Sequence, residues 1–176
     1  MGLDIFFSRF KREKYAEYKK KCKSANKDFK EYEETLTKKY KNVPYDLWSD
    51  EDKAEYQKRY DALPREENYG KEVGYFRKVN FLLPFFGYEE NCEDKEVFLS
   101  EFKTLVERCE KVLEHKGEDE HRYAKELLPT SAGFFFGSTE YGDYYYDDVK
   151  EVKEWASGII ADTNEEDDII IMYCWW

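Results

Sequence analysis

The pattern of apolar and polar positions predicts a β-strand at each end of the chain. In residues 1–10, Leu3, Ile5 and Phe7 alternate with Asp4, Phe6 and Ser8, which is the period of a strand. Residues 168–176 read DIIIMYCWW, and this run of β-branched and aromatic residues predicts a final buried strand. We expect the two terminal strands to be neighbours in one small sheet.

Residues 11–63 predict a helical hairpin. Within residues 11–40, apolar residues recur at alternating spacings of three and four, the repeat of a helix that packs along one seam. The seam consists of Tyr15, Tyr18, Cys22, Ala25, Phe29, Tyr32 and Leu36. A second helix is predicted over residues 49–63, because Ser49 precedes three acidic residues, as in a capped helix N-terminus. We expect an antiparallel pair, inserted as a lobe within a single domain of residues 1–176.

Helical spacing of apolar residues also predicts helices over residues 72–83, 95–113 and 143–157. The most aromatic run of the chain, residues 127–148, follows the second of these helices and includes the start of the third. In this run Phe134–Phe136 predict a short buried strand. The expected fold is therefore α+β: a small sheet that includes the N- and C-terminal strands, packed by several helices, with a projecting charged helical hairpin.

Charge is distributed unevenly along the chain. The 176 residues carry a net charge of −11, of which residues 72–176 hold −14 and residues 1–71 hold +3. The acidic part disfavours non-specific binding to nucleic acid and favours a basic partner surface. Aromatic residues make up 19% of the chain, which argues against intrinsic disorder despite 39% charged residues.

The sequence suggests a protein of the cytosol. No apolar run approaches the roughly 20 residues that span a bilayer, and no secretion signal is visible. The four cysteines are scattered, so we expect reduced thiols and no association with a membrane.

Motifs for catalysis are missing from the sequence. No phosphate-binding loop, GxSxG, HExxH or EF-hand pattern is present. Cys92 would need a histidine base to act as a nucleophile, and both histidines, His115 and His121, fall in a charged loop. No cysteine pair has the spacing of zinc ligands. The pattern favours a non-catalytic protein without a metal or cofactor, although an enzyme is not excluded.

One set of polar residues could line a small-molecule site. Its members are Asp4, Glu72, Arg77, Asn80, Ser138 and Thr139. In this hypothesis Arg77 clamps a carboxylate or phosphate, and aromatic rings stack on a base of a nucleotide-like ligand. The alternative is structural: Arg77 forms an ion pair, and Ser138 and Thr139 cap a helix.

A basic segment at residues 9–23 offers a third possibility. It contains Arg9, Lys11, Arg12, Lys14, Lys19, Lys20, Lys21 and Lys23 against two acidic residues. Such a face could bind nucleic acid, or it could simply be a solvated helix face. Because a net-acidic protein is repelled by phosphate, the sequence favours the solvated face, and nucleic acid is not the expected partner.

Several blocks of the sequence resemble a family of small, uncharacterised phage and prophage proteins. The blocks are MGLD at residues 1–4, EVGYFRK-x-N at 72–80, NCE at 91–93 and LLPTSAGFFFGSTEYGDYYYDD at 127–148. Around Leu83 and Phe85 the sequence departs from the family, which carries a His and a Trp there. The resemblance implies a protein made in the cytosol of a bacterial host. With the surplus of tyrosine, it favours a binding module for host takeover or counter-defence that acts on a host protein.

Overall fold

The computed structural model describes residues 2–88 and 94–176. The chain forms two compact units. We call Met1–Lys11 together with Lys71–Trp176 the sheet unit, and Arg12–Gly70 the hairpin unit. Cys92 lies outside the described residues.

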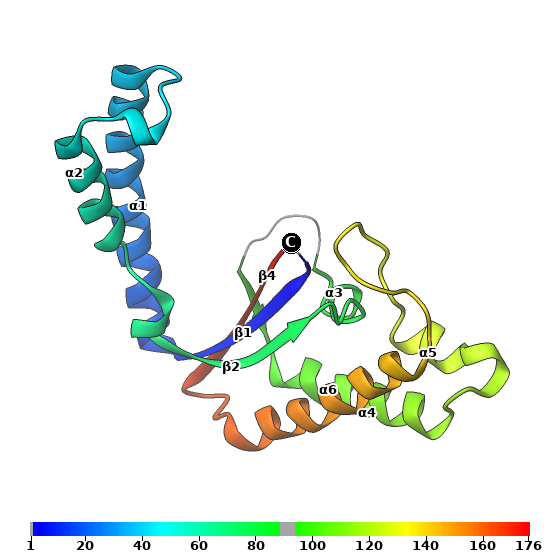
Figure 1. Ribbon diagram of the computed structural model, residues 1–176. Helices are drawn as coiled ribbons and strands as arrows, with labels where there is room; N and C mark the ends of the chain where they lie inside the picture. Colours follow the sequence, from blue (N-terminus) through cyan, green and yellow to red (C-terminus); the bar gives the residue numbers. More distant parts are fainter. Residues whose placement is uncertain (1, 89–93) are drawn as a thin grey trace. The chain divides into compact units, whose positions relative to one another are not determined.

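The sheet has four strands in the order β2-β1-β4-β3 (Figure 1). They are β1 (Asp4–Lys11), β2 (Gly70–Arg77), β3 (Lys95–Val97) and β4 (Asp168–Trp175). β1 pairs antiparallel with β4 along its whole length, with Ile5 opposite Cys174 and Phe10 opposite Ile169. The prediction that the terminal strands are neighbours is confirmed.

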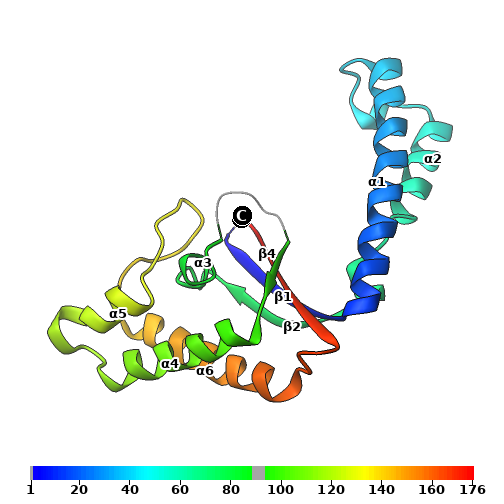
Figure 2. The same ribbon diagram turned by 180° about the vertical axis from the view of Figure 1, so that it is seen from behind.

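Helices cover one face of this sheet. α4 (Leu99–Glu114) and α6 (Asp143–Asp162) lie side by side, with the short α5 (Arg122–Leu127) near the start of α6 (Figures 1 and 2). The core contains alternate residues of the terminal strands, such as Leu3, Ile5, Phe7, Ile170 and Met172, and these are fully or almost fully buried. The α+β fold expected from the sequence is therefore confirmed.

Trp155 of α6 joins three elements at the centre of the sheet unit. Its ring centroid lies 4.6 Å from that of Phe7, 4.8 Å from that of Phe76 and 5.4 Å from that of Phe102. Its indole Nε1 donates a 2.7 Å hydrogen bond to the carbonyl of Val73. The ring fits because residue 74 is glycine: a Cβ there would lie 2.6 Å from Nε1.

The predicted helix at residues 72–83 is wrong. Residues 70–77 form β2, and only Leu82–Phe85 form a single helical turn, α3. The run EVGYFR also alternates with period two, and its Val, Tyr and Phe favour a strand. Pairing beside β1 decides between the two periods, and Lys78, with φ of 64°, then turns the chain out of the sheet.

The predicted strand at Phe134–Phe136 is also wrong. Residues 128–142 form a loop between α5 and α6, and the side chain of Phe134 is 95% exposed. The segment bends back on itself, since Phe136 N–H donates to the Gly133 carbonyl at 3.1 Å. Phe136 instead packs its ring edge-on against Trp176, with centroids 5.4 Å apart.

Two further boundaries differ from the prediction. The segment expected as a helix from residue 95 begins with strand β3, and α4 starts at Leu99. α6 continues through Gly158 to Asp162, because the buried Ile159 extends its apolar stripe. A 3₁₀ turn, Glu118–His121, precedes α5.

The hairpin unit contains α1 (Arg12–Tyr40) and α2 (Asp50–Asp61), with 3₁₀ turns at Tyr45–Leu47 and Glu66–Asn68. The predicted seam is confirmed: its residues are the less exposed ones of α1, and Leu36 is buried. Phe29 packs against Tyr56 of α2 with ring centroids 5.3 Å apart. In the described part of the chain, no helix is both long enough and apolar enough to cross a membrane.

Candidate binding cavity

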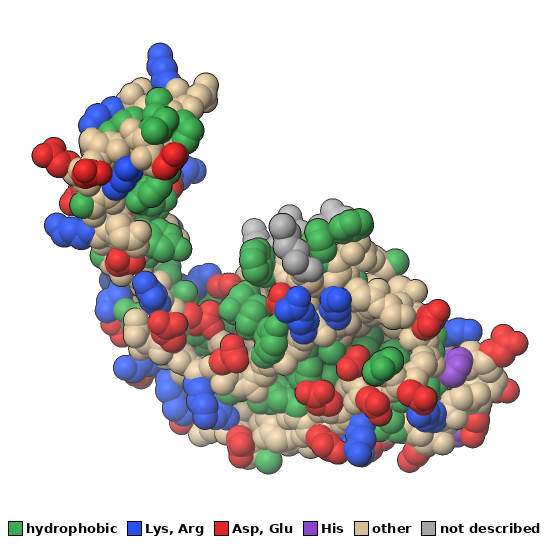
Figure 3. All heavy atoms as spheres, in the orientation of Figure 1, with side chains coloured by type: hydrophobic (Ala, Val, Ile, Leu, Met, Phe, Trp, Pro, Cys, Tyr) green, Lys and Arg blue, Asp and Glu red, His purple; other side chains and the backbone are tan. Residues whose placement is uncertain are grey.

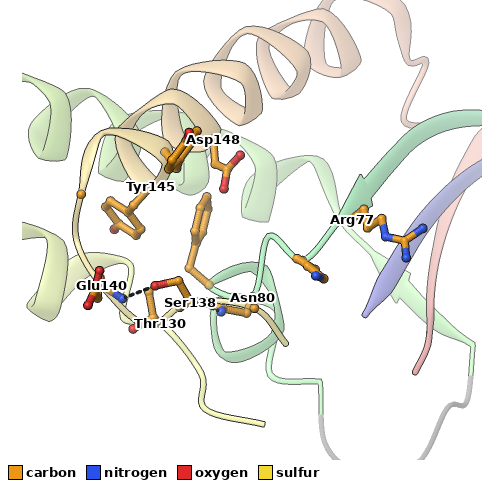
Figure 4. Close-up of a pocket in the computed structure, with 12 residues that line it drawn as sticks. Arg77, Asn80, Thr130, Ser138, Glu140, Tyr145 and Asp148 are labelled. Atoms are coloured by element: carbon orange, nitrogen blue, oxygen red, sulfur yellow. Dashed lines mark hydrogen bonds between the residues drawn. The ribbon is translucent and has the colours of Figure 1, made fainter. Parts of the chain in front are cut away.

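A cavity of about 300 Å³ opens in the sheet unit where three segments meet. The segments are the turn after β2, the loop at residues 128–142 and the first two turns of α6 (Figure 4). Its walls include Asn80, Phe81, Thr130, Ser138, Tyr145 and Asp148. We call this space the Asp148 cavity.

Asn80 fixes the wall formed by the loop. It is 3% exposed, and its amide nitrogen donates to the carbonyls of Phe136 at 3.0 Å and Ser138 at 2.9 Å. Its amide oxygen accepts from the backbone N–H of Ser131 at 3.3 Å. One side chain thus satisfies three backbone groups from two parts of the loop, so the cavity is preformed.

Close packing also holds the turn after β2 against the loop. Lys78 and Gly137 both have left-handed backbones, with φ of 64° and 89°. A Cβ built on Gly137 would lie 3.1 Å from Cβ of Lys78, so a larger residue there would push the two segments apart. Glycine at position 137 is therefore needed for both its conformation and its size.

Asp148 is the unusual group in the wall. Its carboxyl points into the cavity beside Tyr145 (Figure 4). Burial, followed by repulsion from Glu151 and Asp147, raises the pKa of Asp148 to about 6. Within residues 2–88 and 94–176, no hydrogen-bond donor or cation pairs with this carboxyl.

This raised pKa makes a testable prediction about stability. An ionised Asp148 penalises the folded state, so its penalty is absent near pH 3.8, grows as the pH rises and is complete above about pH 6. Asp148→Asn should therefore be more stable than the wild type in urea denaturation at pH 7.5 and equally stable near pH 4. The exposed Glu154→Gln, which does not contribute to the shift at Asp148, is the matched control, and a gain of equal size in both variants would contradict the assignment.

The cavity brings together three of the six site residues predicted from the sequence: Arg77, Asn80 and Ser138. Their roles differ from the hypothesis. The guanidinium of Arg77 points away from the other labelled residues, toward β1 (Figure 4). Ser138 does not cap α6, whose N-cap is Gly142; its Oγ accepts from the N–H of Glu140 at 3.1 Å.

The other three predicted residues do not line the cavity. Asp4 accepts a 2.6 Å hydrogen bond from the hydroxyl of Tyr75, which raises the pKa of that tyrosine. Glu72 lines a separate, more open depression with Trp155. Thr139 is exposed, and its carbonyl accepts from the Thr130 hydroxyl at 3.1 Å.

Asp148 and Tyr144 were not among the small-molecule site residues predicted from the sequence. Asp148 is only partly exposed, unlike Asp147 beside it. A usable signal existed, because Tyr144 and Asp148 are four residues apart and therefore share a helix face.

The described residues offer little for metal or thiol chemistry. They contain no group of three His, Cys, Asp or Glu side chains placed to hold a metal ion. Burial raises the pKa of Cys109 to about 12, so this thiol is a poor nucleophile. His121 contacts the Tyr146 hydroxyl at 2.8 Å, and His115 contacts Glu118 at 2.9 Å.

Three cations of the basic segment have partners within the unit to which each belongs. Arg9 donates to the carbonyl of Asp162 at 2.7 Å, Lys11 pairs with Asp168 at 2.6 Å, and Lys21 pairs with Glu17 at 2.7 Å. These contacts favour a structural role for these three cations over binding to nucleic acid.

Comparison with known proteins adds no relative: no family model, no curated protein and no solved structure matches the chain.

Proposed function

We propose that the protein binds a small organic molecule in the Asp148 cavity without transforming it. The observation that carries this proposal is the buried Asn80, which holds the loop at residues 128–142 against the turn after β2 beside a cavity of ligand size.

The hydrogen-bond partners of the lining groups argue against catalysis in this cavity. The Ser138 hydroxyl receives a backbone N–H, and the hydroxyl of Thr130 donates to a carbonyl. Among the described lining residues, no hydroxyl or thiol lies within hydrogen-bond reach of a base, the arrangement that activates a nucleophile. Binding is therefore favoured over catalysis.

Native mass spectrometry of the protein purified gently from a bacterial lysate tests this proposal. We expect a species heavier than the 21.3 kDa chain by up to a few hundred daltons. Gly142→Leu should lose it, because position 142 lines the cavity and a Cβ there meets no atom within 4 Å.

Gly158→Leu is the control for that variant. A Cβ at position 158 is also unobstructed, but it faces the depression near Trp155. The same bound mass in both variants, or none in the wild type, would contradict the proposal.

A second candidate function is docking to a host protein through the loop of the hairpin unit, residues 41–49. Its side chains include exposed apolar groups: Val43 is 41% exposed, Tyr45 46% and Leu47 67%. Apolar side chains also gather at the loop end of the hairpin in Figure 3. Exposed apolar residues in so charged a hairpin are typical of an interaction surface.

The loop is held in one shape, which is what an interface needs. Trp48 stacks on Tyr40 with ring centroids 4.9 Å apart and donates through Nε1 to the Val43 carbonyl at 3.1 Å. Lys53 donates to the carbonyl of Asp46 at 2.7 Å. The backbone is thus fixed while the side chain of Leu47 stays in solvent.

Leu47→Asp tests this candidate. We expect at least about a tenfold loss of affinity for any protein captured by the wild type, with an unchanged melting temperature, because a charge replaces an interface anchor. Asn26→Asp, also exposed on the hairpin unit, is the control. If both variants retain the same partner equally well, the loop is not the docking surface.

A further inference from the structure

We propose that the ligand of the Asp148 cavity is a small organic cation, an ammonium or guanidinium compound. This inference rests on the proposed small-molecule function and names the ligand class. It reverses the hypothesis drawn from the sequence, in which Arg77 clamps an anion.

The inner wall of the cavity carries the groups that recognise an organic cation. Asp148 supplies a carboxyl without a partner in the described structure, and Phe81 and Tyr145 supply buried aromatic rings beside it, with the exposed Tyr144 at the rim. A carboxylate with aromatic faces attracts alkylammonium and guanidinium groups, since both the charge and the ring quadrupoles favour a cation. The hydroxyl of Tyr145 is already committed to the Leu128 carbonyl at 2.8 Å, so this residue offers its ring.

The cationic residues at the rim are turned elsewhere. A Cβ built on Gly2 would lie 3.3 Å from Nη2 of Arg77 and 3.5 Å from Cε of Lys78. Both side chains therefore extend along the N-terminal segment, and neither is among the groups that shift the pKa of Asp148. Arg77 and Lys78 line part of the cavity, but neither pairs with Asp148.

The electrostatics around Asp148 point the same way. Glu140 lines the cavity from the loop, and Asp147 and Glu151 lie on α6 beside Asp148. Burial first, and then Glu151 and Asp147, raise the pKa of Asp148, and a bound cation would offset this penalty on the charged form. The N-terminus of α6 opposes a cation, but its dipole acts mainly within the first turn, whereas Asp148 lies in the second.

The size of the cavity limits the ligand further. About 300 Å³ is at the lower end of the range for ligand pockets, so a compact cation such as choline or agmatine fits better than a nucleotide. Tyr144, which is 89% exposed, lies at the rim of the cavity.

Isothermal titration calorimetry with choline and agmatine tests the inference. We expect the wild type and Glu154→Gln, an exposed carboxylate of α6 that does not line the cavity, to bind at least one of the two cations at pH 7.5. Asp148→Asn should bind about tenfold or more weakly, the cost of losing one charge-assisted contact. Affinity for the wild type should also fall as the pH is lowered below about 6, where Asp148 gains a proton.

Two neutral or anionic probes separate the possible failures. If the uncharged carbon isostere of choline, or succinate, binds as tightly as choline, the cation inference is wrong but the small-molecule function stands. Failure of choline and agmatine to bind also overturns the inference. The proposed small-molecule function is also contradicted only if, in addition, native mass spectrometry of the wild type shows no bound mass.

Discussion

Replacing Trp155 by alanine should lower the free energy of unfolding by about 3–5 kcal/mol, the cost of removing a large aromatic side chain from a packed site. The indole contacts Phe7 of β1, Phe76 of β2 and Phe102 of α4, with ring centroids 4.6, 4.8 and 5.4 Å away. Its loss also leaves the Val73 carbonyl without its 2.7 Å hydrogen bond. Urea denaturation of the sheet unit measures this change in the free energy of unfolding.

Two companion variants make this result specific. Trp155→Phe keeps a ring but loses the hydrogen bond, so it should cost less than the alanine variant. Trp175→Ala removes an indole that is 64% exposed and should cost less than about 1 kcal/mol. Equal losses for Trp155→Ala and Trp175→Ala would show that Trp155 does not join the sheet to α4 and α6.

Gly74→Ala offers an independent view of the same site. The added Cβ would lie 2.6 Å from Nε1 of Trp155, so the ring must leave its place against Phe7 and Phe76. We expect Gly74→Ala to lose stability through overpacking, whereas Trp155→Ala loses stability because it leaves a cavity.

Replacing Asn80 by alanine should have the second-largest effect. The change leaves the carbonyls of Phe136 and Ser138 and the N–H of Ser131 without their partner. Unsatisfied buried groups cost roughly 1–3 kcal/mol each, and partial access to water at the loop reduces the sum to about 2–4 kcal/mol. Hydrogen exchange should report faster exchange across residues 128–142, together with a lower free energy of unfolding.

Asn26→Ala is the control for that experiment, because Asn26 is exposed on α1. Asn80→Asp is a sharper comparison, since it keeps the acceptor for Ser131 but cannot donate to the two carbonyls. An Asn80→Asp variant as stable as the wild type would mean that the amide donors do not hold the loop.

The sequence predicted those helices and strands whose apolar residues recur with one dominant period. Alternation in the first strand and the β-branched run in the last identified β1 and β4, and the three-four spacing identified the seam of α1. The segment EVGYFR fits both periods, so only its pairing beside β1 makes it a strand. Phe134–Phe136 have high strand propensity but form part of a loop, and no local pattern reveals that.

The candidate site was predictable in part for a similar reason. Asn80 and Ser138 are polar residues beside apolar or glycine-rich segments, which drew attention to them. The orientation of Arg77 depends on its packing beside Gly2, a contact between residues 75 positions apart. The burial of Asp148 depends on the loop folding over α6, so the residue that decides the ligand's charge appears only in three dimensions.

The measurement that tests the account most directly is an NMR titration of the Asp148 carboxyl, in the free protein and in the presence of choline. The account predicts an apparent pKa of about 6 in the free protein and a lower pKa when choline is bound, because the cation stabilises the carboxylate. A pKa near the ordinary value of 3.8 that choline does not change would contradict it.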